Sequence, residues 1–271
     1  MPTYNISIQE IFFYGFIAQF AVFLLRYALV CGGAVLLIKL NEKRLQKRKI
    51  QPQKASWLEM KNEIKWSLST FVIFGCNGSL MFYFINQGYT QMYPDIAARG
   101  WGYFWLSVMA AVLIHDTYFY WAHRLMHHKL LFKRVHLVHH QSKNPTPWAS
   151  FSFHPTEAFL EVLILPLVLF TLPISPWALF TFLNYMVVMN VWGHLGYELL
   201  PRSFPRTFPW SLSLTSTHHN MHHSKNNCNY GFYFSVWDRL CGTMYKDYLG
   251  YYDQVKDRLD EPERVANDEV A

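Results

Sequence analysis

Long apolar runs, separated by charged or proline-containing segments, dominate the pattern of this sequence. Residues 11–38 carry a single charge, Arg26, and residues 66–85 carry none. A helix needs about 20 apolar residues to cross the hydrocarbon core of a bilayer, so each run predicts a membrane-spanning helix. A third run, residues 101–114, continues into aromatic residues up to Trp121. It can also span if its last turns reach the interface.

A fourth apolar run, residues 162–193, is too long for one crossing. It is interrupted by Pro173 and Pro176, and proline cannot continue a helix, so we expect a helical hairpin. The sequence therefore predicts an all-α integral membrane protein with about four to five transmembrane or re-entrant helices. A water-soluble protein with buried helices is the alternative that these lengths disfavour.

Lysine and arginine are frequent in some of the segments that connect the apolar runs and rare in others. Residues 39–65 and 122–155 are rich in both, whereas residues 86–100 contain only Arg99. Basic connections stay in the cytoplasm, which predicts an outward-facing N-terminus and a cytoplasmic, helical, histidine-rich metal domain. We expect the chain to have three parts: an N-terminal transmembrane helix and basic loop (1–65), a membrane catalytic domain (66–245) and a C-terminal tail (246–271).

Composition agrees with a membrane protein. Hydrophobic residues make up 52% of the chain and charged residues 15%, against about 25% charged in soluble proteins. The net charge of +6 would also suit nucleic acid, but the basic residues lie between apolar runs, so we expect no nucleic-acid partner. The four cysteines are far apart and form no C-x-x-C pair, which argues against a disulfide framework or a thiolate metal site.

All 13 histidines lie between His115 and His223. Most belong to three groups, which are His123/His127/His128, His136/His139/His140 and His218/His219/His222/His223. Positions i, i+3 and i+4 share one face of a helix, so each group aims several imidazoles in one direction. Each ring carries a donor and an acceptor that must be satisfied, and neutral imidazole suits zinc, copper, iron and nickel. Eight or more converging rings exceed one tetrahedral site, which favours two metal ions.

These boxes resemble those of the membrane fatty acid hydroxylase and sterol desaturase superfamily. Supporting motifs are Asp116-x-x-x-Tyr-Trp-x-His-Arg124, Asn144-Pro-Thr-Pro147, Ser152-Phe-His-Pro155, His194-x-Gly-Tyr-Glu198 and Asn229-Tyr-Gly-x-Tyr-Phe-x-x-Trp-Asp-Arg239. Within the superfamily, the sequence is most similar to sterol C5-desaturases. The resemblance covers residues 60–245; the preceding residues carry none of it.

The resemblance implies a non-haem di-iron oxidoreductase in lipid biosynthesis. Two iron ions would use O2 and two electrons to hydroxylate or desaturate an unactivated C–H position of a sterol or fatty acyl lipid. Zinc can occupy such sites in purified samples, because it binds imidazole more tightly than Fe(II). The chain has no cytochrome b5 H-P-G-G motif and no cysteine set for an iron–sulfur cluster. A separate electron donor is therefore implied, a ferredoxin or cytochrome b5 type with its reductase, docking on the basic cytoplasmic face.

We expect the metal ligands to come from His123, His127, His128, His136, His139, His140, His194, His218, His219, His222 and His223. His127 and His128 compete for one position, since i+4 spacing favours His127 and the family's longer spacing favours His128. Asp116 and Glu198 fit carboxylates that accept the remaining ring N–H groups. Asp116 equally fits a charge at the interfacial end of a helix.

A second class of function is a histidine-rich membrane metal transporter or metal-binding protein. Transport favours ionisable residues spread through the spanning segments, whereas these runs hold almost none. The localisation expected is a multi-pass protein of a bacterial inner membrane or the endoplasmic reticulum, its active site facing the cytoplasm. A lipid substrate partitions into the bilayer, so we expect lateral access near Trp121, Phe151, Phe153 and Trp192.

Overall fold

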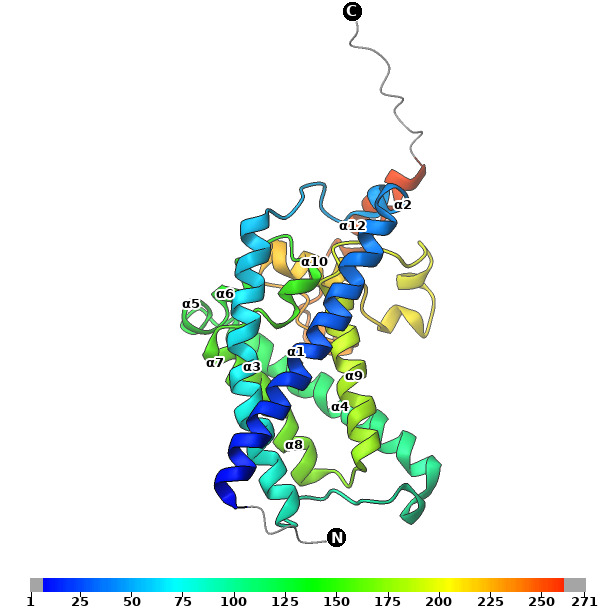
Figure 1. Cartoon of the computed structure of the whole chain (residues 1–271). Coiled ribbons are helices and arrows are strands. Elements are labelled where there is room, and N and C mark those ends of the chain that lie inside the picture. Colours follow the sequence, from blue (N-terminus) through cyan, green and yellow to red (C-terminus); the bar gives the residue numbers. More distant parts are fainter. Residues whose placement is uncertain (1–6, 261–271) are drawn as a thin grey trace, which may run out of the picture.

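The computed structural model describes residues 7–260, and the regular elements in that range are all helices (Figure 1). Four long helices set its shape: α1 (Ile8–Leu40), α3 (Trp57–Asn86), α4 (Gly100–Met126) and α9 (Pro176–Gly193). The shorter α-helices are α2 (Glu42–Leu45), α5 (Phe132–Val135), α6 (Leu137–His140), α7 (Pro155–Val162), α8 (Ile164–Thr171), α10 (Ser216–Lys225), α11 (Val236–Leu240) and α12 (Tyr248–Asp260). The 3-10 turns are η1 (Gln46–Arg48), η2 (Ile96–Ala98), η3 (Pro147–Phe151), η4 (Phe204–Arg206) and η5 (Trp210–Leu212).

Helices α1 and α3 both begin with a reciprocal cap. The Ser7 hydroxyl accepts the backbone N–H of Glu10, and the Glu10 carboxylate accepts the backbone N–H of Ser7. Ser56 and Glu59 form the same arrangement at α3. These caps satisfy backbone donors that have no partner inside the helix. They fix where both long helices start.

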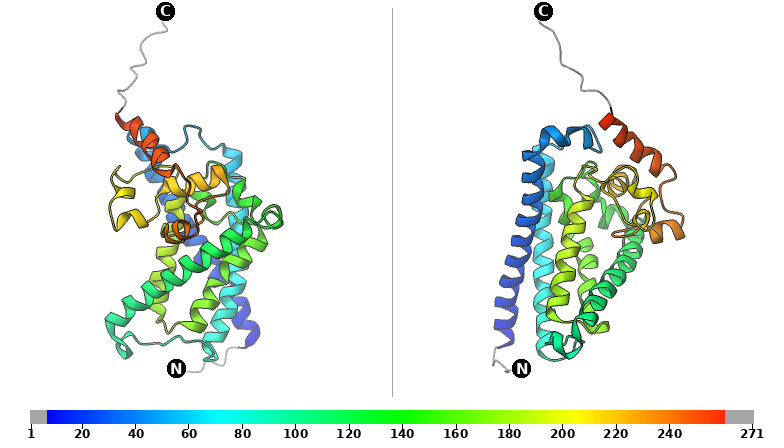
Figure 2. Two further views of the ribbon diagram at one scale, coloured as in Figure 1. Left: turned by 180° about the vertical axis from the view of Figure 1, so that it is seen from behind. Right: turned by 90° about the vertical axis from the view of Figure 1, so that its right-hand side faces the viewer.

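Helices α1 and α3 run side by side along the molecule (Figure 2). Small residues of α3 bring the two helices close together. A Cβ added to Gly75 would lie 3.0 Å from the Phe16 ring, and one added to Gly78 would lie 2.8 Å from Gln19 Cγ. Close approach through small residues is typical of helices packed in a membrane.

The fourth apolar run folds as the expected hairpin of α8 and α9. Leu172 is extended and ends α8, and the Ser175 hydroxyl accepts the Ala178 N–H to start α9. Pro176 is the first residue of α9, where its missing N–H has no cost. The turn therefore follows from the local sequence.

Among residues 7–260, two helices, α1 and α3, are long and apolar enough to cross a membrane. Helix α1 turns many large apolar side chains outward; Leu29, for example, is 65% exposed. The outer faces of α4 and α9 do the same, with exposed Trp105 and Phe180. Apolar surface of this extent marks contact with a membrane or a partner. The structure is thus that of an all-helical protein with two candidate spans.

The histidine-bearing segments gather at the end of the molecule opposite the start of α1 (Figures 1 and 2). The chain between α1 and α3 is tied to the chain after α9 there. The Ile50 N–H donates to the Gly196 carbonyl at 3.0 Å, and the Glu198 N–H donates to the Arg48 carbonyl at 2.9 Å. The loop between the two candidate spans therefore covers the chain that follows α9.

Helix α12 lies where the sequence led us to expect only a tail. Tyr252 and Val255 on this helix are buried, and the Lys256 ammonium donates to the Glu198 carbonyl at 2.9 Å. These apolar positions recur at helical spacing, which explains why the helix packs. Residues 261–271 of the expected tail lie outside the described residues.

Candidate metal centre

Histidines reach the centre from four separate elements. Helix α4 carries His123 near its end and is followed by His127, and His194 directly follows α9. The middle box lies in and just before α6, and the last box lies in α10. The Thr215 hydroxyl accepts the His218 N–H at 3.1 Å and starts α10. Helix ends thus place the imidazoles around a shared space.

The structure divides nine of the histidines into two clusters. In each cluster, one potential ligand atom from every residue lies within 4.8 Å of all the others. The five-histidine cluster comprises His123, His127, His136, His140 and His222. The four-histidine cluster comprises His139, His194, His219 and His223.

His194 is at the middle of the four-histidine cluster. Its Nε2 lies 3.3 Å from His139 Nε2, 3.1 Å from His219 Nε2 and 3.3 Å from His223 Nε2. Its Nδ1 donates to the Asn190 carbonyl at 2.8 Å, so in the neutral ring Nε2 carries only a lone pair. One lone pair cannot accept three hydrogen bonds. Four nitrogens crowded in this way fit a cation between them.

The five-histidine cluster shows the same crowding. His140 Nε2 lies 3.1 Å from His127 Nε2 and 2.9 Å from His222 Nε2, and His123 Nε2 lies 3.0 Å from His136 Nε2. The Nδ1 atoms of His123 and His222 donate to backbone carbonyls at 2.9 and 2.7 Å. Their Nε2 lone pairs therefore face the other rings.

These separations fit a coordination shell. Nitrogens about 2.0–2.1 Å from one metal ion in tetrahedral or octahedral geometry lie about 2.9–3.4 Å apart. Burial lowers the pKa of His219, His222 and His223 well below the ordinary value, with neighbouring imidazoles adding to the effect. The rings are therefore neutral, as metal ligands must be. The donor sets suit two imidazole-bound metal ions.

Glu157 is a functional candidate that the sequence analysis missed. Its carboxylate lies 2.6 Å from His136 Nδ1, and both side chains are almost fully buried. A carboxylate on the far nitrogen orients a ligating imidazole and raises its basicity. The signal was available: Glu157 follows His154-Pro155 and is a charge at the edge of an apolar run.

Two predicted ligands lie outside both clusters. His128 is exposed, two residues beyond the end of α4, so of the competing pair the structure brings His127 to the cluster. His218 is buried, and its Nε2 lies 3.4 Å from the Asp238 carboxylate. Asp238 also accepts the backbone N–H groups of Tyr230 and Gly231. His218 therefore contributes to packing around the clusters.

Asp116 and Glu198 have partners other than imidazoles. Asp116 accepts the backbone N–H groups of Tyr233 and Phe234, at 2.9 and 3.1 Å. Glu198 accepts both the N–H and the hydroxyl of Thr217, and its other oxygen accepts the Leu200 N–H. Helical spacing suggested that these carboxylates lie near ligating histidines. It could not show that backbone N–H groups from residues 200–234 donate to them instead. Both hold backbone in place.

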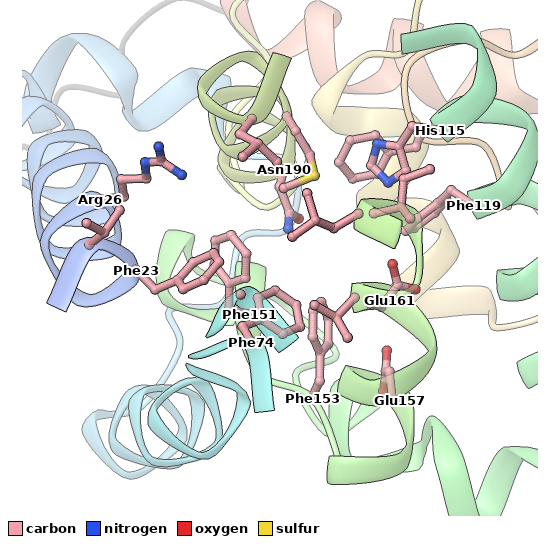
Figure 3. A pocket seen from close by; sticks show the side chains of 18 of the residues that line it. Phe23, Arg26, Phe74, His115, Phe119, Phe151, Phe153, Glu157, Glu161 and Asn190 are labelled. Atoms are coloured by element: carbon pink, nitrogen blue, oxygen red, sulfur yellow. The ribbon is translucent and has the colours of Figure 1, made fainter. Parts of the chain in front are cut away.

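An apolar cavity of about 350 Å³ ends on both clusters. Its metal end is lined by His123, His136, His139, His194 and His219. Its walls include Phe23, Phe74, Phe119, Phe151 and Phe153. Its ionisable lining also includes Glu157 and Glu161 of α7 and, on the opposite side, Arg26 of α1 (Figure 3). The volume is within the range of small-molecule pockets.

Fold and site together describe a helical, membrane-type protein with a polyhistidine metal centre. The sequence profile of the fatty acid hydroxylase family matches residues 108–243, half of the chain. The chain belongs to the fatty acid hydroxylase family. This agrees with the superfamily that the histidine boxes indicated.

Curated relatives include sterol enzymes. The chain is 36% identical to lathosterol oxidase of Rattus norvegicus over 163 residues, covering 58% of this chain and 52% of that protein. It is 30% identical to lathosterol oxidase of Homo sapiens over 191 residues, covering 69% and 61%. It is 34% identical to a Delta(7)-sterol 5(6)-desaturase of Schizosaccharomyces pombe over 171 residues, covering 62% and 53%. The matches thus span between half and three fifths of these relatives. No solved structure matches the chain.

Proposed function

We propose that this protein is an O2-dependent oxidoreductase that hydroxylates or desaturates an unactivated C–H position of a membrane lipid, with sterols as the favoured class. The observation that carries the proposal is the apolar cavity that ends on both histidine clusters. Sterol-acting relatives and the family match favour the same chemistry. A metal transporter would not need an apolar cavity beside its metal site.

Two iron ions are the proposed cofactors, one in each cluster. When bound, they supply the activation of O2 that cleavage of an unactivated C–H bond requires. Hydroxylation inserts one oxygen atom and reduces the other to water. Desaturation removes two hydrogen atoms and reduces both oxygen atoms to water. Either outcome consumes two electrons from outside the chain.

The protein's own residues orient the ligands and exclude water. Glu157 and the backbone carbonyls hold the far nitrogens of His136, His123 and His222, so the Nε2 atoms face inward. The Phe153 ring lies 5.2 Å from that of His139 and forms part of the cavity wall beside this histidine. An aromatic wall next to a polar centre positions an apolar substrate without offering it a competing hydrogen bond.

Access to the cavity is proposed to be lateral, from the bilayer. Its lining includes Val22 and Arg26 of α1 and Phe180 and Leu183 of α9. The Arg26 guanidinium carbon lies 5.4 Å from the centre of the Phe180 ring, so this pair bridges α1 and α9. Apolar substrates gain about 0.8 kcal/mol per CH2 group by partitioning out of water, which concentrates them at such an opening.

The proposed topology is multi-pass, with α4 and the α8–α9 hairpin entering the membrane beside α1 and α3. Basic residues in 39–65 and 122–155 favour a cytoplasmic position for the metal centre, in a bacterial inner membrane or the endoplasmic reticulum. Residues 1–271 hold no cluster of cysteines that could bind an iron–sulfur centre. A separate ferredoxin or cytochrome b5 type donor with its reductase would therefore supply electrons, docking on the face formed by the basic residues of 39–65 and 122–155.

Lipid mass spectrometry tests the function. Membrane lipids of a host expressing the chain are compared with those of the same host expressing the His222→Ala variant. We expect a lipid that gains one oxygen atom or loses two hydrogen atoms only with the unaltered chain. Identical lipid profiles, with the protein present and metal-loaded and its electron donor co-expressed, would exclude the proposed activity.

A further inference from the structure

A second cavity lies where α1 ends and the chain turns back toward α3. It encloses about 230 Å³ and is separate from the cavity at the metal clusters. One side is the last turns of α1, and the other is formed by residues 144–147 and 195–197. Its polar lining includes Lys39, Glu42, Lys49, Lys54, Asn144 and Tyr197. We call it the Lys49 cavity.

Lys49 is the unusual member of this lining. The residue is only 6% exposed, and its ammonium group has no hydrogen-bond partner among the described residues. Its backbone is fixed, because Lys49 bridges Tyr197 and the next residue, Ile50, donates to the Gly196 carbonyl at 3.0 Å. A buried, unpaired ammonium is strongly unfavourable and calls for an anion.

The charges around Lys49 also favour an anion. Three lysines line the cavity, against a single carboxylate, Glu42. Glu42 is already engaged: its carboxylate lies 2.7 Å from the Lys54 ammonium at the exposed rim. Glu42 also interacts electrostatically with Lys39 and Lys49, so one carboxylate faces three ammonium groups and the lining keeps a net positive charge. Phosphate, with several strong acceptor oxygens, is the anion that can bridge such ammonium groups.

The other wall of the cavity is apolar. Val35 and Ile38 of α1, Met60 of α3 and Leu195 also line it. A free anion gains nothing from such a wall, whereas a lipid has an acyl chain to place on it. The cavity also lies at the end of two candidate membrane spans, at the level expected for lipid headgroups.

We propose that the Lys49 cavity binds the phosphate group of an anionic phospholipid, with the acyl side against α1 and α3. The site is distinct from the substrate cavity. Residues 195–197 of its wall directly follow His194, so lipid binding would hold in place the chain that carries this histidine. The bound lipid is therefore a structural ligand of the metal domain.

The test uses the full chain, purified in a zwitterionic detergent and stripped of phospholipid. Its thermal unfolding midpoint is measured with added phosphatidylglycerol, phosphatidylcholine or inorganic phosphate. A ligand that binds only the folded state raises the midpoint with concentration. We expect phosphatidylglycerol to raise it most and at the lowest concentration. Equal stabilisation by inorganic phosphate at the same concentration would overturn the lipid source and assign the site to a free phosphate.

Three variants locate the effect. Lys49→Met keeps the length of the buried side chain without its charge, and Lys39→Met removes an exposed charge from the same lining. Lys43→Met makes the same net change of charge at an exposed residue outside the cavity. We expect at least a tenfold higher phosphatidylglycerol requirement for Lys49→Met, a smaller increase for Lys39→Met and none for Lys43→Met. If Lys49→Met does not fold, the comparison of Lys39→Met with Lys43→Met is decisive. Equal phosphatidylglycerol requirements for these two variants would overturn the proposed site. The readout is lipid binding, so its outcome is independent of lipid oxidation.

Discussion

Replacing Glu157 by glutamine should weaken metal binding in the five-histidine cluster. The carboxylate lies 2.6 Å from His136 Nδ1, and the pair is buried, so water cannot replace the lost charge. A hydrogen bond to a charged group contributes about 1.5–3 kcal/mol, against about 0.5–1.5 kcal/mol for a neutral one. The difference of about 1–1.5 kcal/mol corresponds to roughly a five- to tenfold loss of affinity. Loss of the whole contact, as in Glu157→Leu, should cost about 10–100-fold.

The assay is competition for iron with a chelator of known affinity, followed by elemental analysis of the protein. Glu161→Gln is the matched control: it makes the same change one turn further along the chain. Glu161 also lines the substrate cavity, but it contacts no imidazole among the described residues. We expect Glu161→Gln to keep the original affinity. Equal affinities for Glu157→Gln and the unaltered chain would refute the role given to this carboxylate.

Three further predictions follow from the site and its supports. His139→Ala and His222→Ala should each lower metal content in elemental analysis and abolish activity in lipid assays. His128→Ala should change neither quantity. Full metal retention in the first two variants would contradict the ligand sets. Phe153→Leu should alter the position of oxidation or the preferred lipid while metal content stays constant. An unchanged product spectrum in mass spectrometry would show that Phe153 does not position the substrate. Tyr27→Phe removes a 2.8 Å hydrogen bond from α1 to the Trp148 carbonyl of η3. It should lower stability by about 0.5–1.5 kcal/mol, seen as a lower unfolding midpoint in detergent; an unaltered midpoint would show that the bond is dispensable.

The long helices and the hairpin follow from local sequence signals. Apolar runs predict α1 and α3, and Pro173 and Pro176 predict the turn between α8 and α9. The i, i+3 and i+4 spacing also predicted that the boxes converge, but the structure divides the middle and last boxes between the two clusters. Spacing alone also favoured His127 over His128, and the structure places His127 in the cluster.

Contacts between distant loops could not be predicted. Asp116 and Glu198 have suitable spacing to nearby histidines, yet backbone groups from other segments occupy both carboxylates. Glu157 reaches His136 only because α7 packs beside α5. Such partners depend on the tertiary arrangement of chain segments, about which periodicity within one helix carries no information. Helix α12 is different, because its buried Tyr248, Tyr252 and Val255 recur at helical spacing, a signal that the sequence analysis did not use.

Counting iron while measuring activity tests the central claim most directly. The protein is stripped of metal, reloaded anaerobically with graded amounts of Fe(II), and assayed for lipid oxidation with O2 and an electron donor. Two histidine clusters predict that iron binding saturates at two ions per chain and that full activity requires both. Full activity with one iron ion per chain, or saturation at a single ion, would contradict the two-centre account.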